Sequence, residues 1–501
     1  MTSYAFAIDL RRCIGCHACT IACKAEHAVP LGVNRCWVKS VERGSFPDAQ
    51  RLFFPVLCNQ CEAAPCAAVC PTEALYRRGD GIVELDGERC IGCRSCMQAC
   101  PYDQLFVDPD TRTAEKCNFC ANRIETGLLP ACVSVCPTQC RVFGDLEDPA
   151  SQLAGVLRAH ATRVRKPEKG TRPRVFYVSA EDDVIVPELS VRPFRYKEGQ
   201  VRWRPVGALR EDPARPAAAR VDYDVPHAKP WHGLVVAYLL AKGVSTGALF
   251  LSALFWLLGL RGALSERIGP ALALAFAGIT AGLLVLDLER PERFLWVLTR
   301  RQPRSWLVRG AFLLTAHAAV AGLWLAGSFG AAARLRPWLA VPALVMPVLA
   351  TVFTSFLFAQ GRGRDLWQSR ASAFDLLAQA LAAGAAALLL LAPAVAADDS
   401  LLFALRAALA AALAAHLLLL TGEHALRRSP TPHHALAVTT YLRGPFARAF
   451  WGGAVVAGGV APLVLLALAP AAAAAAAALA LAGALAWEYV WVEAGQSVPL
   501  S

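Results

Sequence analysis

The cysteines constrain the fold of this chain more than any other feature. All 18 lie at or before Cys140 of a 501-residue sequence, and 16 of them form four groups of four. In chain order the groups are Cys13, Cys16, Cys19 and Cys23; Cys58, Cys61, Cys66 and Cys70; Cys90, Cys93, Cys96 and Cys100; and Cys117, Cys120, Cys132 and Cys136. The first and third groups have the spacing C-x2-C-x2-C-x3-C, whereas the second widens the middle interval to four residues and the fourth to eleven. This repeated spacing predicts ligands of metal centres rather than disulfides.

The spacing within each group suits a cubane iron–sulfur cluster. Three cysteines at two-residue intervals on a tight loop can reach three irons of one cluster. The fourth cysteine, just before a proline, ligates the other cluster in two-cluster ferredoxins. Proline follows Cys70, Cys100 and Cys136, whereas Lys24 follows Cys23. We therefore predict that the first 140 residues bind 4Fe–4S clusters.

Structural zinc is the alternative, because two C-x2-C pairs also make a four-thiolate zinc site. A zinc site does not need a third cysteine at the same interval and a fourth before proline, so the spacing favours iron–sulfur. Metal analysis would distinguish the two, since a zinc site contains no acid-labile sulfide. Cys36 and Cys140 fall outside the pattern, and we interpret them as small buried hydrophobic residues.

The fourth group carries a family resemblance. The run Lys116–Arg123, continued by Gly127, by Pro130 to Cys132 and by Cys136-Pro-Thr, resembles the iron–sulfur subunit of dimethyl sulfoxide reductase-type molybdoenzymes. Polysulfide reductase and the nitrite-reduction electron-transfer proteins have similar subunits, and the resemblance covers residues 4–180. It implies four 4Fe–4S clusters, in which groups one and four exchange their last cysteines, as do groups two and three. The implied ligand sets are Cys13, Cys16, Cys19 with Cys136; Cys117, Cys120, Cys132 with Cys23; Cys58, Cys61, Cys66 with Cys100; and Cys90, Cys93, Cys96 with Cys70.

We expect an α+β ferredoxin-like domain over residues 1–190. The β-prone runs Gly81–Leu85 and Val175–Val178 suit its small hairpins and a closing strand. Residues 191–230 are rich in Pro, Arg and Asp and are predicted to be a linker. The stretch 1–10 lacks a basic region followed by an apolar run, so no signal peptide is expected.

Residues 231–501 have the composition of a membrane protein. Eight apolar runs of membrane-spanning length occur at 233–260, 268–286, 307–328, 338–359, 374–396, 401–420, 446–469 and 471–491. Their number and length argue against buried helices of a large soluble protein. The sequence therefore predicts an all-α polytopic membrane domain of about eight transmembrane helices, in contact with membrane lipid.

The formal charge of +11 reflects arginines that lie largely between these runs, so we expect no nucleic-acid partner. The connections after runs two, four and six carry Arg290, Arg293, Arg300, Arg301, Arg304, Arg309, Arg362, Arg364, Arg370, Arg427, Arg428 and Arg443. The opposite connections carry Arg261, Arg267, Arg334 and Arg336. With eight spans, the arginine-rich connections lie on the same side of the membrane as the N-terminal domain. Because loops rich in arginine stay in the cytoplasm, we predict a multi-pass protein of the cell (inner) membrane with its iron–sulfur domain on the cytoplasmic face. The family relatives that work outside the membrane, exported folded with a partner, leave the opposite orientation open.

A second resemblance covers the membrane half. The stretches Tyr238–Gly247, Asp287–Phe294 and Glu493–Pro499 resemble the polysulfide reductase/NrfD-type anchor family. This resemblance implies an eight-helix anchor without haem that binds a quinone near one membrane face.

Polar groups within apolar runs are costly and therefore candidates for function. Trp231 and His232 could stack on a quinone ring and donate a hydrogen bond to it. Lys242, ten residues into the first run, could serve the quinone or a proton, or pair with an acid such as Asp287. His317 and His416 could ligate a b-type haem, but hydrogen bonds across helices are the favoured interpretation. The acids near span ends, which could carry protons, are Asp287, Glu289, Asp375 and Glu423.

Together these features predict a subunit of an oxidoreductase complex with no catalytic site for the terminal substrate. It would pass electrons between quinone (menaquinone or ubiquinone) and a separate molybdopterin-type catalytic subunit, in either direction. Two alternatives stay open: a module of a larger quinol-oxidising respiratory complex that delivers electrons to cytochromes, and an ion-translocating protein.

Overall fold

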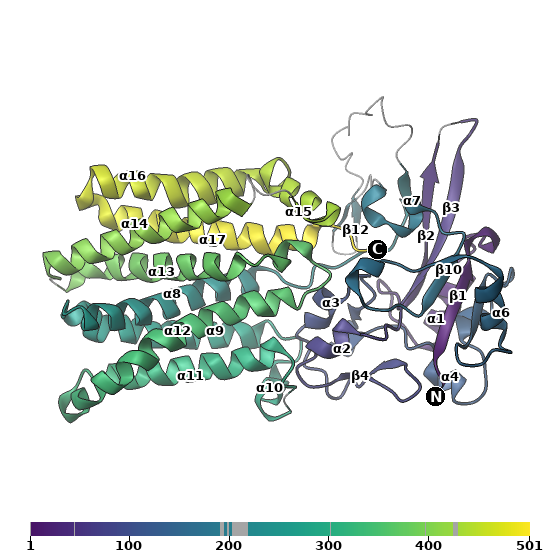
Figure 1. Cartoon of the computed structure of the whole chain (residues 1–501), viewed down its shortest axis with the longest axis horizontal. Coiled ribbons are helices and arrows are strands. Elements are labelled where there is room, and N and C mark those ends of the chain that lie inside the picture. Colours follow the sequence, from purple (N-terminus) through teal and green to yellow (C-terminus); the bar gives the residue numbers. More distant parts are fainter. Residues whose placement is uncertain are drawn as a thin grey trace. The chain divides into compact units, whose positions relative to one another are not determined.

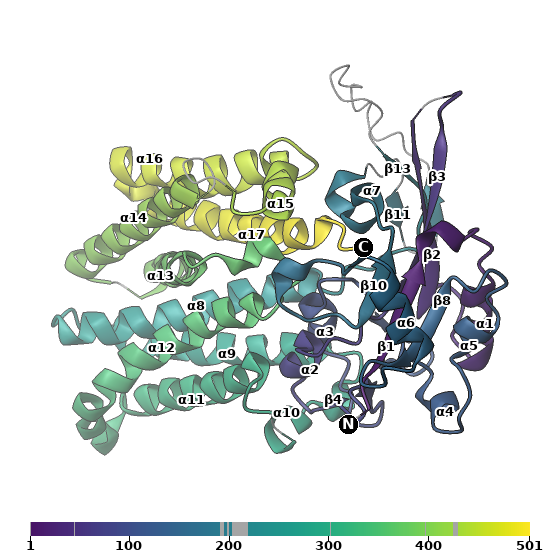
Figure 2. The same ribbon diagram turned by 45° about the vertical axis from the view of Figure 1, so that its right-hand side comes forward.

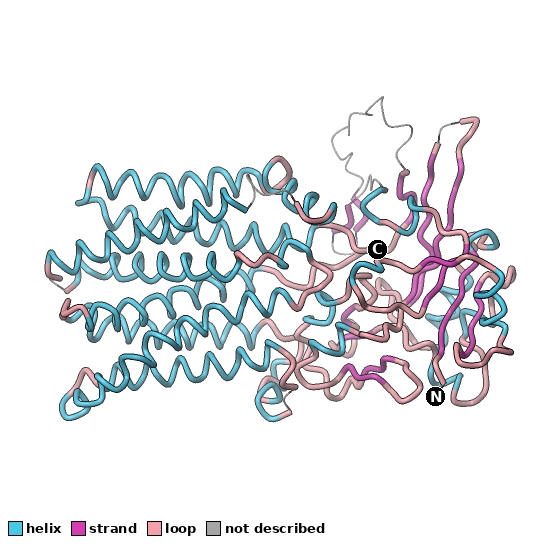
Figure 3. Tube along the Cα trace, viewed as in Figure 1, coloured by secondary structure: helices cyan, strands magenta, loops and turns pink. Residues whose placement is uncertain are grey.

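The computed structural model describes residues 2–44, 46–190, 195–197, 200–202, 219–300, 302–395, 397–423 and 429–501. The chain divides into two compact units, Met1–Pro230 with Pro499–Ser501, and Trp231–Val498 (Figure 1). Figure 3 shows strands and short helices in the first unit, whereas every regular element described in the second is a helix. The two units correspond to the cysteine-rich and the membrane-like halves of the sequence.

A four-stranded sheet, in the order β8-β1-β10-β9, forms the centre of the first unit. β1 (Tyr4–Asp9) runs parallel to β10 (Val175–Val178) and antiparallel to β8 (Arg141–Asp145), and β9 is Thr162–Arg163. The strand predicted at Val175–Val178 is confirmed. Its β-branched and aromatic side chains are suited to a buried sheet, and they lie in the core beside β1.

A second sheet has the order β13-β2-β3. β2 (Cys36–Arg43) and β3 (Gln50–Leu57) form a long antiparallel pair, and β13 (Arg220–Tyr223) adds to the free edge of β2. Most of the linker predicted over 191–230 lies outside the described residues, but β13 falls within it and is part of a sheet. Asp224 fixes the strand's end, because its Oδ1 accepts a 2.8 Å hydrogen bond from Trp37 Nε1.

The remaining elements of the first unit are short. The hairpins are β4 (Leu75–Arg77) with β5 (Val83–Leu85), β6 (Phe106–Val107) with β7 (Ala114–Glu115), and β11 (Arg195–Lys197) with β12 (Gln200–Arg202). The helices are α1 (Ala18–Glu26), α2 (Pro65–Val69), α3 (Ser95–Ala99), α4 (Ala121–Ile124), α5 (Ala131–Ser134), α6 (Gln152–Ala159) and α7 (Asp182–Ile185). The hairpin predicted around Gly81–Leu85 is confirmed by β5. Helices α1 to α5 each contain a cysteine or directly follow one, so they position the thiols.

The second unit is a helical bundle. Among the described residues, eight helices are long and apolar enough to cross a membrane: Gly233–Leu257, Leu264–Leu286, Trp306–Ala326, Ala332–Ala359, Ser372–Ala394, Asp399–Thr421, Ala449–Leu468 and Pro470–Ser497. Their α-helical parts are α8 (Gly233–Leu257), α9 (Gly269–Leu286), α11 (Trp306–Ala326), α12 (Arg336–Ala359), α13 (Ser372–Leu391), α14 (Asp399–Thr421), α16 (Ala461–Leu468) and α17 (Ala473–Ser497), while α10 (Trp296–Thr299) and α15 (Pro432–Leu442) lie between spans. All eight predicted spans are thereby confirmed. Arg301, Arg427 and Arg428 of the predicted connections lie outside the described residues.

Helices α8 and α13 form the centre of the bundle, since about three quarters of each span is buried inside the protein. In Figure 2, α13 is seen between α8 and α14. The two central helices touch backbone to backbone: a Cβ atom on Gly384 would lie 2.3 Å from the carbonyl carbon of Gly247. Small residues allow such close packing where no hydrophobic effect drives helices together.

Candidate functional site

The cysteine loops of groups one and three fold alike. Gly15 and Gly92 both have φ of +69°, and the residues two positions later, His17 and Arg94, have φ of 58° and 59°. Glycine reaches such a conformation without strain. Helices α1 and α3 begin directly after these loops, so one sequence pattern produces one local structure twice.

The first candidate site is a cavity lined by thiols from two distant groups. Cys13, Cys16 and Cys19 come from the loop before α1 and its first turn, and Cys136 comes from the fourth group. The loop after Cys136 brings Cys140 and Arg141 to the same cavity. This lining corresponds to one of the four ligand sets that the family resemblance implies.

A second cavity repeats this arrangement with the middle groups. Cys58, Cys61 and Cys66 line it together with Cys100. Asn59, Gln60, Tyr102 and Leu105 complete much of the wall. The last cysteine again belongs to a different group from the first three, as the resemblance implies.

The last cysteine of group one lies beside group four, and the last cysteine of group two lies beside group three. The thiol of Cys23 is close enough to Cys120 and Cys132 to interact electrostatically with both. The thiol of Cys70 is likewise close enough to Cys93 and Cys96 to interact electrostatically with both. These neighbours correspond to the other two implied ligand sets.

The arrangement of the thiols suits a cluster better than a single ion. Sulfurs around one zinc ion lie 2.3 Å from it, hence within about 4 Å of one another. Among the described residues, no three His, Cys, Asp or Glu side chains gather closely enough to hold one metal ion. Each cavity is lined by four of the grouped cysteines, which is the number of thiolates that a 4Fe–4S cluster needs. A bound cluster would accept electrons one at a time.

Burial also favours a charged metal centre. It raises the pKa of Cys66 and Cys93 to about 12 and that of Cys132 to about 11. These thiols would therefore stay neutral at pH 7 without a cation beside them, whereas iron–sulfur clusters are held by thiolates. The irons of a cluster supply the positive charge that such thiolates need.

Arg141 is a buried cation at the first cavity that the sequence reasoning missed. Its Nη2 donates to Cys19 Sγ at 3.4 Å and to Cys36 Sγ at 3.2 Å. Its Nη1 is buried with no hydrogen-bond partner. Cys36 and Cys140 are buried as predicted; Cys140 lines this cavity, and Cys36 contacts Arg141 behind it. An arginine directly after the last cysteine was the signal that could have identified it.

A histidine contacts the fourth group. The Nε2 atom of His27, just after α1, lies 3.1 Å from Cys120 Sγ. Burial is the main cause that lowers the pKa of this imidazole, to about 4. It is therefore neutral at pH 7 and can donate one hydrogen bond to the sulfur.

In the membrane unit, the predicted quinone residues occupy different surroundings. The Trp231 ring is buried and stacks on Trp367 at a centroid distance of 5.6 Å. The His232 side chain is 61% exposed, and its Nδ1 lies 3.4 Å from Glu493 Oε1. Lys242 lies ten residues further along α8, about 15 Å away. The structure therefore does not bring all three residues to one point.

Lys242 is buried in the middle of α8, with 2% of its surface exposed. Its Nζ donates to Thr354 Oγ1 and lies 5.5 Å from the centroid of the Phe353 ring. The carboxylate that acts electrostatically on it is Glu488 of α17, rather than the predicted Asp287. The sequence analysis did not identify Glu488, although a carboxylate within an apolar run is a candidate for function.

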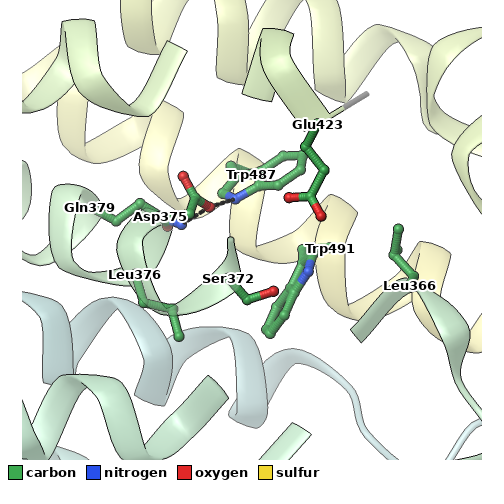
Figure 4. A pocket seen from close by; sticks show the side chains of 8 residues that line it. All are labelled: Leu366, Ser372, Asp375, Leu376, Gln379, Glu423, Trp487 and Trp491. Atoms are coloured by element: carbon green, nitrogen blue, oxygen red, sulfur yellow. Dashed lines mark hydrogen bonds between the residues drawn. The ribbon is translucent and has the colours of Figure 1, made fainter. Parts of the chain in front are cut away.

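The two histidines within spans hydrogen-bond across helices, as predicted. His317 Nε2 lies 2.9 Å from Ser245 Oγ, and His416 Nδ1 lies 2.5 Å from Asp375 Oδ1. Asp375 also lines a small pocket together with Ser372, Gln379, Glu423, Trp487, Trp491, Leu366 and Leu376 (Figure 4).

A unit in which cysteines of two groups line each of two cavities, joined in one chain to eight apolar helices, defines a membrane-anchored iron–sulfur electron-transfer protein. Two family models match: a "4Fe-4S dicluster domain" over residues 49–146 and "Polysulphide reductase, NrfD" over residues 224–499. The second covers more than half of the sequence. This chain therefore belongs to the polysulphide reductase, NrfD family, and it carries 4Fe–4S clusters in its first unit.

Several curated proteins are similar to part of this chain. A tetrathionate reductase subunit of Salmonella typhimurium is 47% identical over 188 residues, which are 37% of this chain and 75% of the relative. A polysulfide reductase chain of Wolinella succinogenes is 43% identical over 180 residues, 35% of this chain and 93% of the relative. Protein NrfC of Escherichia coli is 43% identical over 178 residues, 35% of this chain and 80% of the relative.

Proposed function

We propose that this chain passes electrons between the membrane quinone pool and a separate molybdopterin-type catalytic subunit, through four 4Fe–4S clusters. The observation that carries the proposal is the pair of cavities in which three thiols of one group meet the last thiol of another. This exchange is the arrangement of ferredoxins that hold two clusters close together. Electrons can pass between clusters that share such a loop framework.

The sixteen grouped cysteines would be the cluster ligands. Two of the four proposed sets are supported by a common cavity, and the other two by the proximity of Cys23 and Cys70 to their partner groups. Cys36 and Cys140 are left over, and they would contribute to the surroundings of the first cluster instead.

The membrane unit would supply the quinone site. A quinone ring needs an aromatic surface and a hydrogen-bond donor to its carbonyl oxygens. Trp231 and Trp367 form a stacked aromatic pair at the end of the bundle where α8 begins, and exposed His232 lies beside them. The pair of His232 and Glu493 can take a proton that a quinol releases. Lys242 lies too far along α8 to touch the same ring, so its role would concern protons.

The chemistry joins a two-electron carrier to one-electron carriers. A quinol loses two electrons and two protons. Clusters accept the electrons one at a time, and nearby polar groups accept the protons. The reverse direction is equally consistent with the site, because cluster potentials span a wide range.

The terminal reaction would take place on another subunit. Two of the relatives are, by their names, components of tetrathionate reductase and of polysulfide reductase, and thus parts of reductase complexes. The molybdopterin type of the partner follows from the family resemblance alone. The alternative partner is a cytochrome of a larger quinol-oxidising complex.

We further propose that the iron–sulfur unit faces the cytoplasm. The arginine-rich connections after the second, fourth and sixth spans support this orientation. Protease digestion of sealed vesicles of known sidedness tests it, because only the exposed unit is cleaved.

Anaerobic purification of the full chain from its native membranes tests the proposal. Four clusters require about sixteen irons and sixteen acid-labile sulfides per chain, together with a copurifying subunit that contains a pterin and molybdenum or tungsten. Zinc without sulfide would refute the cluster assignment. A cytochrome in place of the pterin subunit would favour the alternative complex.

A further inference from the structure

Four ionisable side chains lie inside the membrane unit on four different helices. They are Lys242 of α8, Glu488 of α17, Asp375 of α13 and His416 of α14, and each is at least nine-tenths buried. Charged groups within membrane spans are expensive, and they mark pathways for ions and protons. No cluster ligand lies near them in sequence, so cluster binding does not account for them.

Asp375 contacts one member of this group, His416, directly. Its Oδ1 lies 2.5 Å from His416 Nδ1, and its Oδ2 accepts hydrogen bonds from Gln379 Nε2 at 2.7 Å and from Trp487 Nε1 at 3.3 Å. Carboxyl and imidazole groups at this distance can exchange a proton directly. The pair therefore joins α13 to α14 by a proton-transfer contact.

Glu488 lies within electrostatic range of both Asp375 and Lys242. Its Oε2 atom is buried and has no hydrogen-bond partner, and the same is true of Gln379 Oε1. Among the described residues, Lys242 has no carboxylate within ion-pair distance. The interior thus keeps two unsatisfied acceptors on helices that pack against α8, an arrangement that a purely structural network would avoid.

The pocket beside Asp375 is suited to water and not to quinone. Its volume is about 10 Å³, counted over the positions open to the centre of a water molecule, which is room for one water. Figure 4 shows Glu423 and Asp375 on its wall. Glu423 lies just past the end of α14, so the pocket connects the end of a span with the buried pair.

These groups lie at increasing depth in the bundle. Asp375 is three residues from the start of α13, whereas Lys242 is nine residues into α8 and Glu488 nine residues from the end of α17. At 1.5 Å per residue, the first is about 5 Å and the others about 14 Å from the helix ends. The series runs from the end of the bundle to its middle.

Polar side chains continue beyond Lys242. Thr351 Oγ1 donates to Thr246 Oγ1 at 2.9 Å, one helical turn further along α8. Ser245 contacts His317, whose Nδ1 is buried without a partner. Hydroxyl and imidazole groups can pass protons on in either direction.

We propose that these residues form a proton path through the membrane unit, from Glu423 by way of Asp375, His416 and Glu488 to Lys242 and the hydroxyl groups beyond it. The path moves protons only: each step forms one O–H or N–H bond and breaks another. Electron transfer between quinol and the clusters drives it, so the inference rests on the proposed function.

The test uses the full holoprotein in sealed lipid vesicles that contain a pH-sensitive dye. A short-chain quinol supplies electrons, and an excess of ferricyanide accepts them from the clusters. Cluster reduction is followed before ferricyanide is added and proton movement after it, and empty vesicles correct for the direct reaction of quinol with ferricyanide. The test variants are Asp375→Asn and Glu488→Gln, which preserve size. The matched controls are the exposed residues Asp399→Asn and Glu292→Gln.

If the proposed path exists, we expect the wild type and both controls to move protons across the membrane during turnover. The two test variants should keep cluster reduction and lose at least about nine-tenths of that movement. Equal movement in all five proteins, or none in the wild type, would overturn the path. If quinol fails to reduce the clusters, the proposed function is wrong, and the path is then judged with the same dye under an imposed membrane potential, which should drive protons through the wild type and not through the two test variants.

Discussion

Arg141 is a buried cation beside the thiols of the first cavity. A guanidinium that is fully buried among Cys19, Cys36 and Cys140 offsets the negative charge of thiolates and sulfides. The cysteines themselves were predictable, because their spacing is a local pattern. The position of Arg141 directly after Cys140 was a local signal, but its contact with Cys19 joins positions 122 residues apart and is visible only in the structure.

Replacing Arg141 with methionine should lower the midpoint potential of the cluster at Cys13, Cys16, Cys19 and Cys136. Loss of the cation and its hydrogen bonds destabilises the reduced, more negative state. An electron paramagnetic resonance redox titration measures the shift, and an unchanged total signal shows that the cluster is still bound. The exposed Arg158→Met is the control. Equal potentials in both variants would mean that Arg141 has no influence on the cluster.

His227 makes the first unit sensitive to alkaline pH. Burial lowers its pKa, but Asp224 and Asp103 outweigh burial and raise the pKa to about 9; the Asp103 carboxylate lies 2.7 Å from Nδ1. Because the folded state holds the proton more tightly than the unfolded chain, the protonated pair stabilises the fold. This contribution is complete below pH 6.5 and is lost as the pH rises through about 9.

His227→Gln should therefore destabilise the first unit by about 3 kcal/mol at pH 6, and the difference from the wild type should shrink towards pH 10. The measurement is anaerobic denaturant-induced loss of cluster absorbance at several pH values. A difference that does not depend on pH would contradict the ion-pair explanation.

At the scale of elements, the membrane spans were predictable and the strand β13 was not. The eight spans are confirmed because length and hydropathy are local signals. β13 lies in a stretch rich in Pro, Arg and Asp, and its partner β2 is about 180 residues away in sequence. Only pairing in three dimensions identifies it as a strand.

The contact of α8 with α13 predicts that Gly384→Ala destabilises the membrane unit by about 1–3 kcal/mol. Its new methyl group would overlap the backbone of Gly247 and force two central helices apart. The free energy of unfolding in detergent measures the effect. Gly278→Ala in α9 is the matched control, since nothing lies within 4 Å of its new Cβ. Equal stabilities would show that the helices separate without cost.

At the scale of the whole molecule, two functions that require different solvents share one polypeptide. Cluster binding needs cysteines held on turns of a folded domain in water, whereas a quinone enters its site from the lipid bilayer. Each half was predictable because each has its own signature, in cysteine spacing or in apolar runs. The buried series Lys242, Glu488, Asp375 and His416 could not be predicted as a unit, since it joins four helices that are distant in sequence.

The central claim is that one chain links quinone to clusters. The most direct measurement adds a quinol analogue to the anaerobically purified, oxidised protein and follows cluster reduction by electron paramagnetic resonance. We predict reduction within the mixing time of a rapid-freeze experiment, blocked by a quinone-site inhibitor and slowed in His232→Ala. Clusters that stay oxidised with quinol, but reduce fully with dithionite, would contradict a quinol-oxidising site on this chain.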